Sequence, residues 1–172
     1  MTRYTIIFGI VAVIVVAVIF GDVSCTDQSI KDYTQTIKSD STDASYNKVN
    51  VYNNRGLIYA ALGQYQEAIH DYNQAIELNP TDMNAYYNRG LSWFKLGEYK
   101  QAIWNHKRVI EFGRGDSDVY FSRGLANEML GKYIYALSDF DQALRLDSSN
   151  VLARSGKIRV NQILRDEKRQ IE

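Results

Sequence analysis

One segment of the chain returns three times at a spacing of 34 residues. The first copy contains Asn54-Arg55-Gly56 followed by Leu62-Gly63, and the same pattern begins again at Asn88-Arg89-Gly90 and at Ser122-Arg123-Gly124. A fixed period of this length is typical of solenoids in which each copy is a pair of helices. A single pair cannot bury its apolar face, so the stacking of neighbouring copies supplies the core. The recurrence therefore predicts an all-α chain.

The copies resemble the tetratricopeptide repeat family. With the recurring glycine taken as the eighth position, three repeats cover residues 49–82, 83–116 and 117–150. The positions that match the family are Tyr52, Tyr86 and Tyr120 (fourth), Gly56, Gly90 and Gly124 (eighth), Ala68, Ala102 and Ala136 (twentieth), and Tyr72, His106 and Phe140 (twenty-fourth). The resemblance implies an α-solenoid of antiparallel helix pairs, each joined at a Leu-Gly turn, with a role in protein–protein interaction.

Two further helices are expected beside the repeats. Within a tether of residues 26–48, the stretch 29–37 matches residues 68–76 at Ile, Asp, Tyr, Gln and Ile, which predicts a half-repeat helix over about 27–39. Residues 151–172 are expected to form a capping helix and a charged tail. The apolar side of this helix is predicted to contain Leu152, Ala153, Gly156, Val160, Ile163 and Leu164. The opposite side would give the last repeat a polar outer face.

The N-terminal segment has the character of a membrane signal. Residues 6–20 are uncharged and apolar, with Arg3 before them and Asp22 after them. A helix over 5–21 would span about 25 Å, within the lower range for a bilayer. Residues 1–25 are therefore expected to be a signal anchor or a signal peptide. Val23-Ser24-Cys25 resembles the end of a bacterial lipoprotein signal, so Cys25 is a possible lipidation site.

The charge flanking this segment predicts its orientation. Arg3 is expected to stay on the cytoplasmic side by the positive-inside rule. The repeat domain would then lie on the periplasmic or extracytoplasmic side of the cytoplasmic membrane. Whether the segment is retained, cleaved or lipidated stays open, and all three alternatives place the repeats on the same side.

Arginine recurs at the seventh position of each repeat, as Arg55, Arg89 and Arg123. Aspartate recurs at the twenty-third position in two repeats, and Asn105 interrupts the series. One interpretation is an arginine ladder for an acidic ligand. The other, which we favour, is structural ion pairing between the helices, because the planar guanidinium can satisfy a carboxylate twice.

Composition excludes several classes of function. The chain has 20 Lys+Arg and 20 Asp+Glu, and this balance argues against a nucleic-acid binder. With two histidines and one cysteine, a zinc site is not expected. His106 stands at an aromatic position of the repeat and is expected to pack in the core. No catalytic triad or phosphate-binding loop is present, so we expect neither an enzyme nor a cofactor.

Family resemblance predicts a groove for a protein or peptide partner on the first helix of each repeat. Its candidate residues are Asn53, Leu57, Asn84, Tyr87, Asn88, Leu91, Phe94, Phe121, Leu125 and Met129. The apolar members with polar edges have the composition of a peptide groove. The alternative is that these side chains are partly buried against neighbouring helices.

One branch of the family grips the C-terminal carboxylates of chaperones. The positions that form its clamp hold Asn53, Leu57, Asn88, Asp118 and Ser122 here, and only Asn88 fits. Binding of Hsp70 or Hsp90 is therefore not implied. The sequence predicts a membrane-tethered scaffold or adaptor. Two alternatives are a lipoprotein assembly factor of the pilotin type and a structural subunit packed permanently in a membrane complex.

Overall fold

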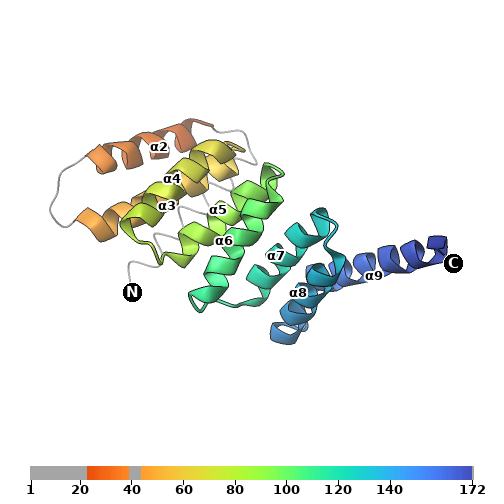
Figure 1. The fold of residues 1–172 in the computed structure, drawn as a ribbon. Coiled ribbons are helices and arrows are strands. Elements are labelled where there is room, and N and C mark those ends of the chain that lie inside the picture. The colour runs from red at the N-terminus through yellow and green to blue at the C-terminus, as the bar shows by residue number, and fades with distance from the viewer. Residues whose placement is uncertain (1–22, 39–43, 172) are drawn as a thin grey trace. The chain divides into compact units, whose positions relative to one another are not determined.

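The computed structural model describes residues 23–38 and 44–171 (Figure 1). Most of the predicted signal segment, residues 1–22, lies outside the described residues. Within those residues every regular element is an α-helix, which confirms the all-α prediction. The helices are α2 (Val23–Lys38), α3 (Ala44–Ala61), α4 (Tyr65–Leu78), α5 (Met83–Lys95), α6 (Tyr99–Glu111), α7 (Ser117–Met129), α8 (Tyr133–Leu146) and α9 (Val151–Ile171). None of these described helices is long and apolar enough to cross a bilayer.

The helices pair as helix-turn-helix units: α3 with α4, α5 with α6, and α7 with α8. The turn glycines have left-handed backbone angles, with φ of 75° at Gly63, 80° at Gly97 and 69° at Gly131. At the middle turn the Gly97 amide donates to the Phe94 carbonyl at 3.0 Å, and the Glu98 amide donates to the Trp93 carbonyl at 2.9 Å. Glycine ends these first helices because it adopts this conformation without a steric penalty.

The chain forms two compact units, Met1–Ala85 and Tyr86–Glu172. In the first unit, Val49, Ala75 and Ala85 form a buried cluster with Tyr52 and Ile76 against it. The half-repeat helix α2 begins at Val23, before the predicted start, and α3 begins at Ala44, ahead of the predicted repeat boundary.

Helix α2 is held on α3 by polar contacts. The Arg55 guanidinium donates to the Thr34 hydroxyl at 2.9 Å. Asn54 hydrogen-bonds to Tyr33, and partial burial raises the pKa of that phenol. The half-repeat helix therefore docks on the first complete repeat within its own unit.

In the second unit, α9 covers the last repeat through close contact with Phe140. The buried cluster comprises Ala136, Phe140, Ala143, Ala153 and Val160. A Cβ atom added at Gly156 would lie 2.7 Å from Phe140 Cζ, and one added at Gly124 would lie 2.9 Å from Phe140 Cε1. Only glycine lets α7 and α9 approach the two sides of this ring so closely.

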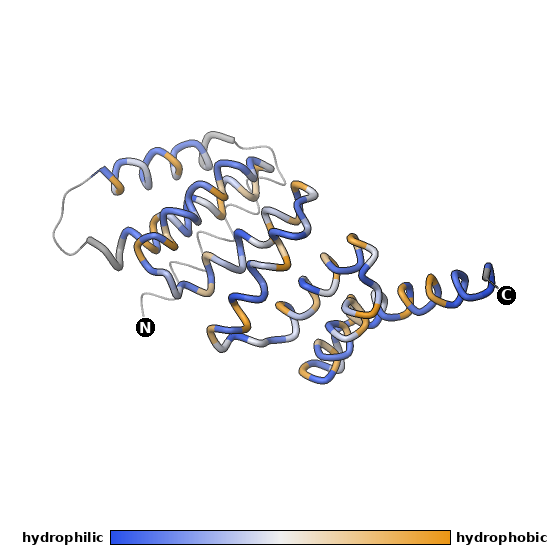
Figure 2. Tube along the Cα trace, viewed as in Figure 1, coloured by the Kyte–Doolittle hydropathy of each residue, from blue (hydrophilic) through white to orange (hydrophobic). Residues whose placement is uncertain are grey.

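The two predicted faces of the cap are confirmed except at Leu152: Ala153, Gly156 and Val160 are buried, and Arg154, Ser155, Gln162 and Arg165 are exposed. Leu152 was expected on the buried side, but it is 64% exposed, and Ile158 is 65% exposed. The buried stripe runs through Ala153, Gly156 and Val160, because the contact of Gly156 with Phe140 sets which side of α9 faces α8. Leu152 is rotated about 100° from Ala153 on the helix. Hydrophobic positions recur along α9 (Figure 2), and Leu152 and Ile158 among them remain uncovered.

Candidate protein-interaction site

The arginine of the first repeat forms a structural ion pair. Arg55 Nη2 lies 2.6 Å from Asp71 Oδ1, and Arg55 Nε donates to Asp71 Oδ2 at 2.8 Å. The Asp71 carboxylate is buried, and its hydrogen bond raises the pKa of Arg55. Asp32 of the half repeat matches Asp71 in sequence, yet it is exposed and accepts from Gln28 instead. The half repeat has no first helix to supply an arginine.

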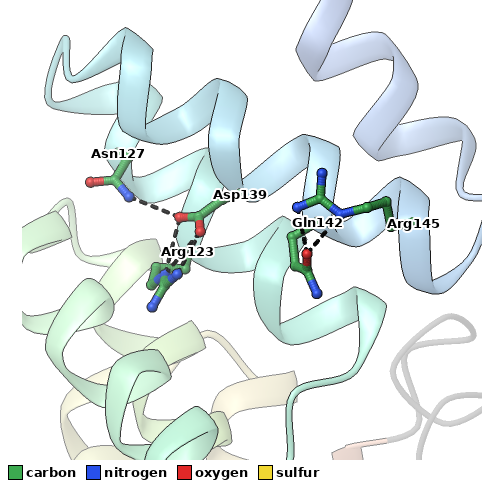
Figure 3. Close-up of polar contacts among 5 residues, drawn as sticks. All are labelled: Arg123, Asn127, Asp139, Gln142 and Arg145. Carbon is green, nitrogen blue, oxygen red and sulfur yellow. Dashed lines mark hydrogen bonds and ion pairs between the residues drawn. The ribbon is translucent and has the colours of Figure 1, made fainter.

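The same ion pair is present in the third repeat, where the aspartate accepts from one additional donor. Arg123 Nη2 lies 2.6 Å from Asp139 Oδ1, and its Nε donates to Oδ2 at 3.0 Å. Asn127, one turn further along α7, donates to the same Oδ2 at 3.0 Å (Figure 3). The two paired repeats confirm that the recurring arginines join the two helices of a repeat, as favoured from the sequence.

The middle repeat replaces the acid by an amide. Arg89 Nε donates to Asn105 Oδ1 at 2.9 Å, and Asn105 Nδ2 donates to the Gln101 carbonyl at 2.8 Å. Burial lowers the pKa of Arg89, because desolvation penalises the guanidinium charge. The arginine keeps its position between the two helices, but the side chain at position 105 that it contacts is a neutral amide.

A cation–π contact accompanies each of these arginines. The guanidinium carbon lies 5.8 Å from the Tyr52 ring centroid for Arg55, 5.1 Å from Tyr86 for Arg89, and 5.4 Å from Tyr120 for Arg123. From the sequence, the fourth-position tyrosines were identified only as positions that match the repeat family. The tyrosine and the arginine stand three residues apart on one helix, so their side chains are neighbours. This spacing predicts the contact.

His106 packs in the core, as predicted. Its side chain is fully buried, and the Tyr87 ring lies against it with centroids 5.6 Å apart and the ring planes tilted by 58°. Burial, with a smaller contribution from the Arg123 charge, lowers its pKa to about 4. Neither ring nitrogen has a hydrogen-bond partner among the described residues. The imidazole therefore acts as a neutral ring at neutral pH.

In the first unit, the predicted groove residues have different environments. Asn53 is 7% exposed and donates to Asp82 Oδ2 at 3.1 Å. Asp82 Oδ1 in turn accepts from the amides of Asn84 and Ala85, so Asn53 supports the start of α5. Leu57 is 41% exposed, and Asn84 is exposed.

In the second unit, most of the predicted groove residues are half-buried. The Phe94 ring contacts Tyr99, and the Phe121 ring lies 6.1 Å from Phe140. Met129 is 51% exposed. The remaining members, each half-buried, are Tyr87, Asn88, Leu91 and Leu125. The aromatic members thus also pack against second helices, whereas Met129 leaves apolar surface exposed.

A cleft that the sequence did not indicate lies between α6, α7 and α8 of the second unit. Its volume is about 510 Å³, and its lining includes Lys107, Arg123, Lys132 and Asp139. We call it the charged cleft. Its residues come from two repeats, and the 34-residue period alone does not show which of them converge.

The remaining candidates concern metals and lipid. Within residues 23–38 and 44–171, no three His, Cys, Asp or Glu side chains gather in a way that could hold a metal ion. Cys25 lies in the first turn of α2. Its side chain, the possible lipidation site, lies outside the described side chains.

Comparison with known proteins identifies the repeats. A sequence model described as TPR repeat matches residues 56–97. No curated protein matches the chain. Among solved structures, the first TPR domain of Spaghetti (RPAP3) bound to the HSP90 peptide SRMEEVD is 26% identical, with a TM-score of 0.67, covering 69% of this chain and 94% of that one. The TPR domain of Arabidopsis OM64 is also 26% identical, with a TM-score of 0.67, covering 69% of this chain and 98% of that one.

A structure of lower identity shows the same fold over more of the chain. The MamA RS-1 ArsTM double mutant has a TM-score of 0.75 at 19% identity, covering 91% of this chain and 84% of that one. Together with the helix pairs and their glycine turns, these comparisons show a TPR repeat over residues 56–97 and the fold of tetratricopeptide repeat domains over most of the chain. The chain is thus similar to the non-enzymatic scaffold domains of the tetratricopeptide repeat family.

Proposed function

We propose that this protein is a membrane-tethered scaffold that binds a peptide segment of a partner through the first-helix face of its repeats. The observation that carries the proposal is the uncovered apolar surface on α7. Met129 is 51% exposed, and Leu125, one turn earlier, is half-buried. Side chains four residues apart share a helix face, so the two form a continuous apolar patch.

Relatives support binding of peptides by this architecture. The RPAP3 domain similar to this chain was solved with an HSP90 peptide that ends in EEVD. Here the clamp positions include Asp118, which is exposed and negatively charged, and Leu57, which is apolar and 41% exposed. An acid at a clamp position repels a carboxylate terminus. We therefore propose a peptide bound mainly through apolar side chains rather than a chaperone tail.

The groove is best tested on its exposed members, because Tyr87 and Phe121 also pack inside the unit. The variant Leu125→Ala with Met129→Ala should lower recovery of the crosslinked partner from membranes. Loss of an apolar anchor typically costs about 2 kcal/mol, or roughly 30-fold in affinity. The matched control is Ile134→Ala with Ile158→Ala, which removes apolar side chains that are 70% and 65% exposed elsewhere. Equal recovery with both variants would contradict the groove.

Membrane attachment is proposed from the apolar run between Ile6 and Phe20. The full-length chain should fractionate with membranes and resist alkaline extraction. Removal of residues 1–22 should release it, and α2, which begins at Val23, is left intact by this truncation. The proposed orientation requires that external protease reach the repeats in spheroplasts. Protection of the repeats, or alkaline release of the full-length chain, would contradict this part.

Two alternatives remain as outcomes of the same work. Mass spectrometry that finds a diacylated Cys25 would favour a lipoprotein assembly factor of the pilotin type. A partner that stays bound through purification and seals Met129 from chemical oxidation would favour a structural subunit of a membrane complex. A retained N-terminus and a reversible partner would favour the scaffold.

A further inference from the structure

The charged cleft has a buried polar floor. Arg123 and Asp139 contribute to it from α7 and α8, and their side chains are 23% and 6% exposed. The Asp139 carboxylate accepts from Arg123 and from Asn127, so its charge is already matched within the protein (Figure 3). The floor is therefore fixed by internal contacts and carries no excess of negative charge.

The rim of the cleft is cationic. Lys107 stands on α6 with a side chain that is 64% exposed, and Lys132, which directly precedes α8, is also exposed. The nearest carboxylate to Lys107 is Glu111, at 3.5 Å and one turn further along the same helix. Such exposed pairs on one helix are weak. Cations outnumber anions in the lining by two, although the whole chain has no net charge.

Apolar surface also lines the cleft. Tyr135 on α8 is 68% exposed, and Ile103 on α6 also lines the cleft. An exposed tyrosine beside separated lysines offers an aromatic contact together with ion pairs. This combination suits a segment with acidic side chains on either side of an apolar residue.

The cleft is separate from the first-helix groove. At about 100° per residue, Arg123 is rotated about 200° around α7 from Phe121, and Asn127 is rotated about 200° from Leu125. The groove residues of α7 therefore face nearly opposite to those of the cleft. None of the positions of the chaperone-tail clamp lines the cleft. Occupation of one surface leaves the other free.

We propose that the charged cleft between α6, α7 and α8 is a second binding site that takes an acidic peptide segment, independently of the first-helix groove. The segment's carboxylates pair with Lys107 and Lys132, and an intervening apolar side chain lies against Tyr135. The lysine charges select acidic segments, so binding weakens as salt screens the exposed charges.

The test measures fluorescence anisotropy of a labelled eight-residue peptide of alternating Glu and Leu against the full-length protein in detergent. The comparison peptide alternates Gln and Leu, with the same length and apolar content. The variant Lys107→Gln with Lys132→Gln removes the rim charges and keeps the aliphatic stems. The matched control, Lys95→Gln with Lys100→Gln, removes two exposed lysines of the same unit outside the cleft.

We expect the Glu peptide to bind the wild-type chain, and the rim variant to bind it about fivefold more weakly. Lys107→Arg with Lys132→Arg should restore binding, and Leu125→Ala with Met129→Ala should leave it unchanged. Equal binding of the two peptides, equal loss in the rim variant and the lysine control, or no binding by the wild-type chain would each overturn the proposal.

Discussion

The middle and third repeats share a fold but join their two helices with different chemistry. In the third repeat, the Arg123 guanidinium meets the Asp139 carboxylate at 2.6 Å. In the middle repeat, Arg89 donates to the neutral amide of Asn105 at 2.9 Å. Hydrogen bonds between two charged groups are the strong ones. We infer that α5 and α6 are held together less tightly than α7 and α8.

The buried ring beside the helix-packing glycine also differs. Phe140 in the third repeat and His106 in the middle repeat are both fully buried. A Cβ added at Gly90 would lie 2.9 Å from His106 Cε1, the same distance as that from Gly124 to Phe140 Cε1. The shape is kept, but histidine adds two buried nitrogens that lack partners in the described part of the chain. Stability in the middle repeat therefore depends on this ring staying neutral.

The largest expected effect is a loss of stability in acid that depends on His106. Its pKa in the folded chain is about 4, below the ordinary value of 6.5. The unfolded chain therefore binds more protons between these values, so stability is fully present above pH 6.5 and falls as the pH drops towards 4. The shift corresponds to a loss on the order of 3 kcal/mol.

His106→Phe should remove this acid limb, which urea denaturation between pH 7 and pH 4 can measure. It should also raise stability at pH 7 by about 1 kcal/mol, because two unpartnered polar atoms are removed. The exposed histidine supplies the control, since His70→Phe should leave the pH dependence in place. An unchanged loss of stability between pH 7 and pH 4 in the His106→Phe variant would show that His106 is not its cause.

The next prediction concerns a substitution that gives the third repeat the neutral amide found in the middle repeat. Asp139→Asn would place an amide where Arg123 and Asn127 both donate. We expect a loss of about 2 kcal/mol, less than for a fully buried ion pair because the Arg123 side chain is 23% exposed. The exposed Asp166→Asn is a matched change and should shift the melting transition little. Equal stability of the Asp139→Asn variant and the wild-type chain would show that the ion pair is not what joins α7 and α8.

A third prediction concerns what the two repeats share. Ala102 and Ala136 are both fully buried at the twentieth position. Ala102→Leu and Ala136→Leu should each overpack the space between two helices and cost about 1–3 kcal/mol. Thermal melts should show losses of similar size. A much smaller loss of stability for Ala102→Leu than for Ala136→Leu would mean that the middle repeat is already loosely packed.

Much of the fold could be predicted from the 34-residue period. The period located the helix pairs, the Leu-Gly turns and the recurring arginines, because each follows from local helix geometry repeated in three copies. The half-repeat helix was found for the same reason, although its start at Val23 was missed. Recurrence also favoured ion pairs over a ligand ladder, since Asp71 and Asp139 keep a constant spacing from their arginines.

The features that the sequence missed depend on contacts between elements that do not recur. Leu152 was assigned to the buried side of the cap, but the contact between Gly156 and Phe140 sets the rotation of α9. Lys107 of one repeat and Lys132 of the next line the same charged cleft. The sequence left open whether the groove aromatics are partly buried, and Phe121 is half-buried and packs towards Phe140.

The most direct test of the comparison is native-state hydrogen exchange of the wild-type chain and the Asn105→Asp variant. The wild-type chain should exchange faster in α5 and α6 than in α7 and α8. The variant supplies a carboxylate to Arg89, and a gain of about 1 kcal/mol should slow exchange in α5 and α6 roughly fivefold. Protection in α7 and α8 should change less. Equal protection of the two helix pairs in the wild-type chain, or no slowing in the variant, would contradict the account.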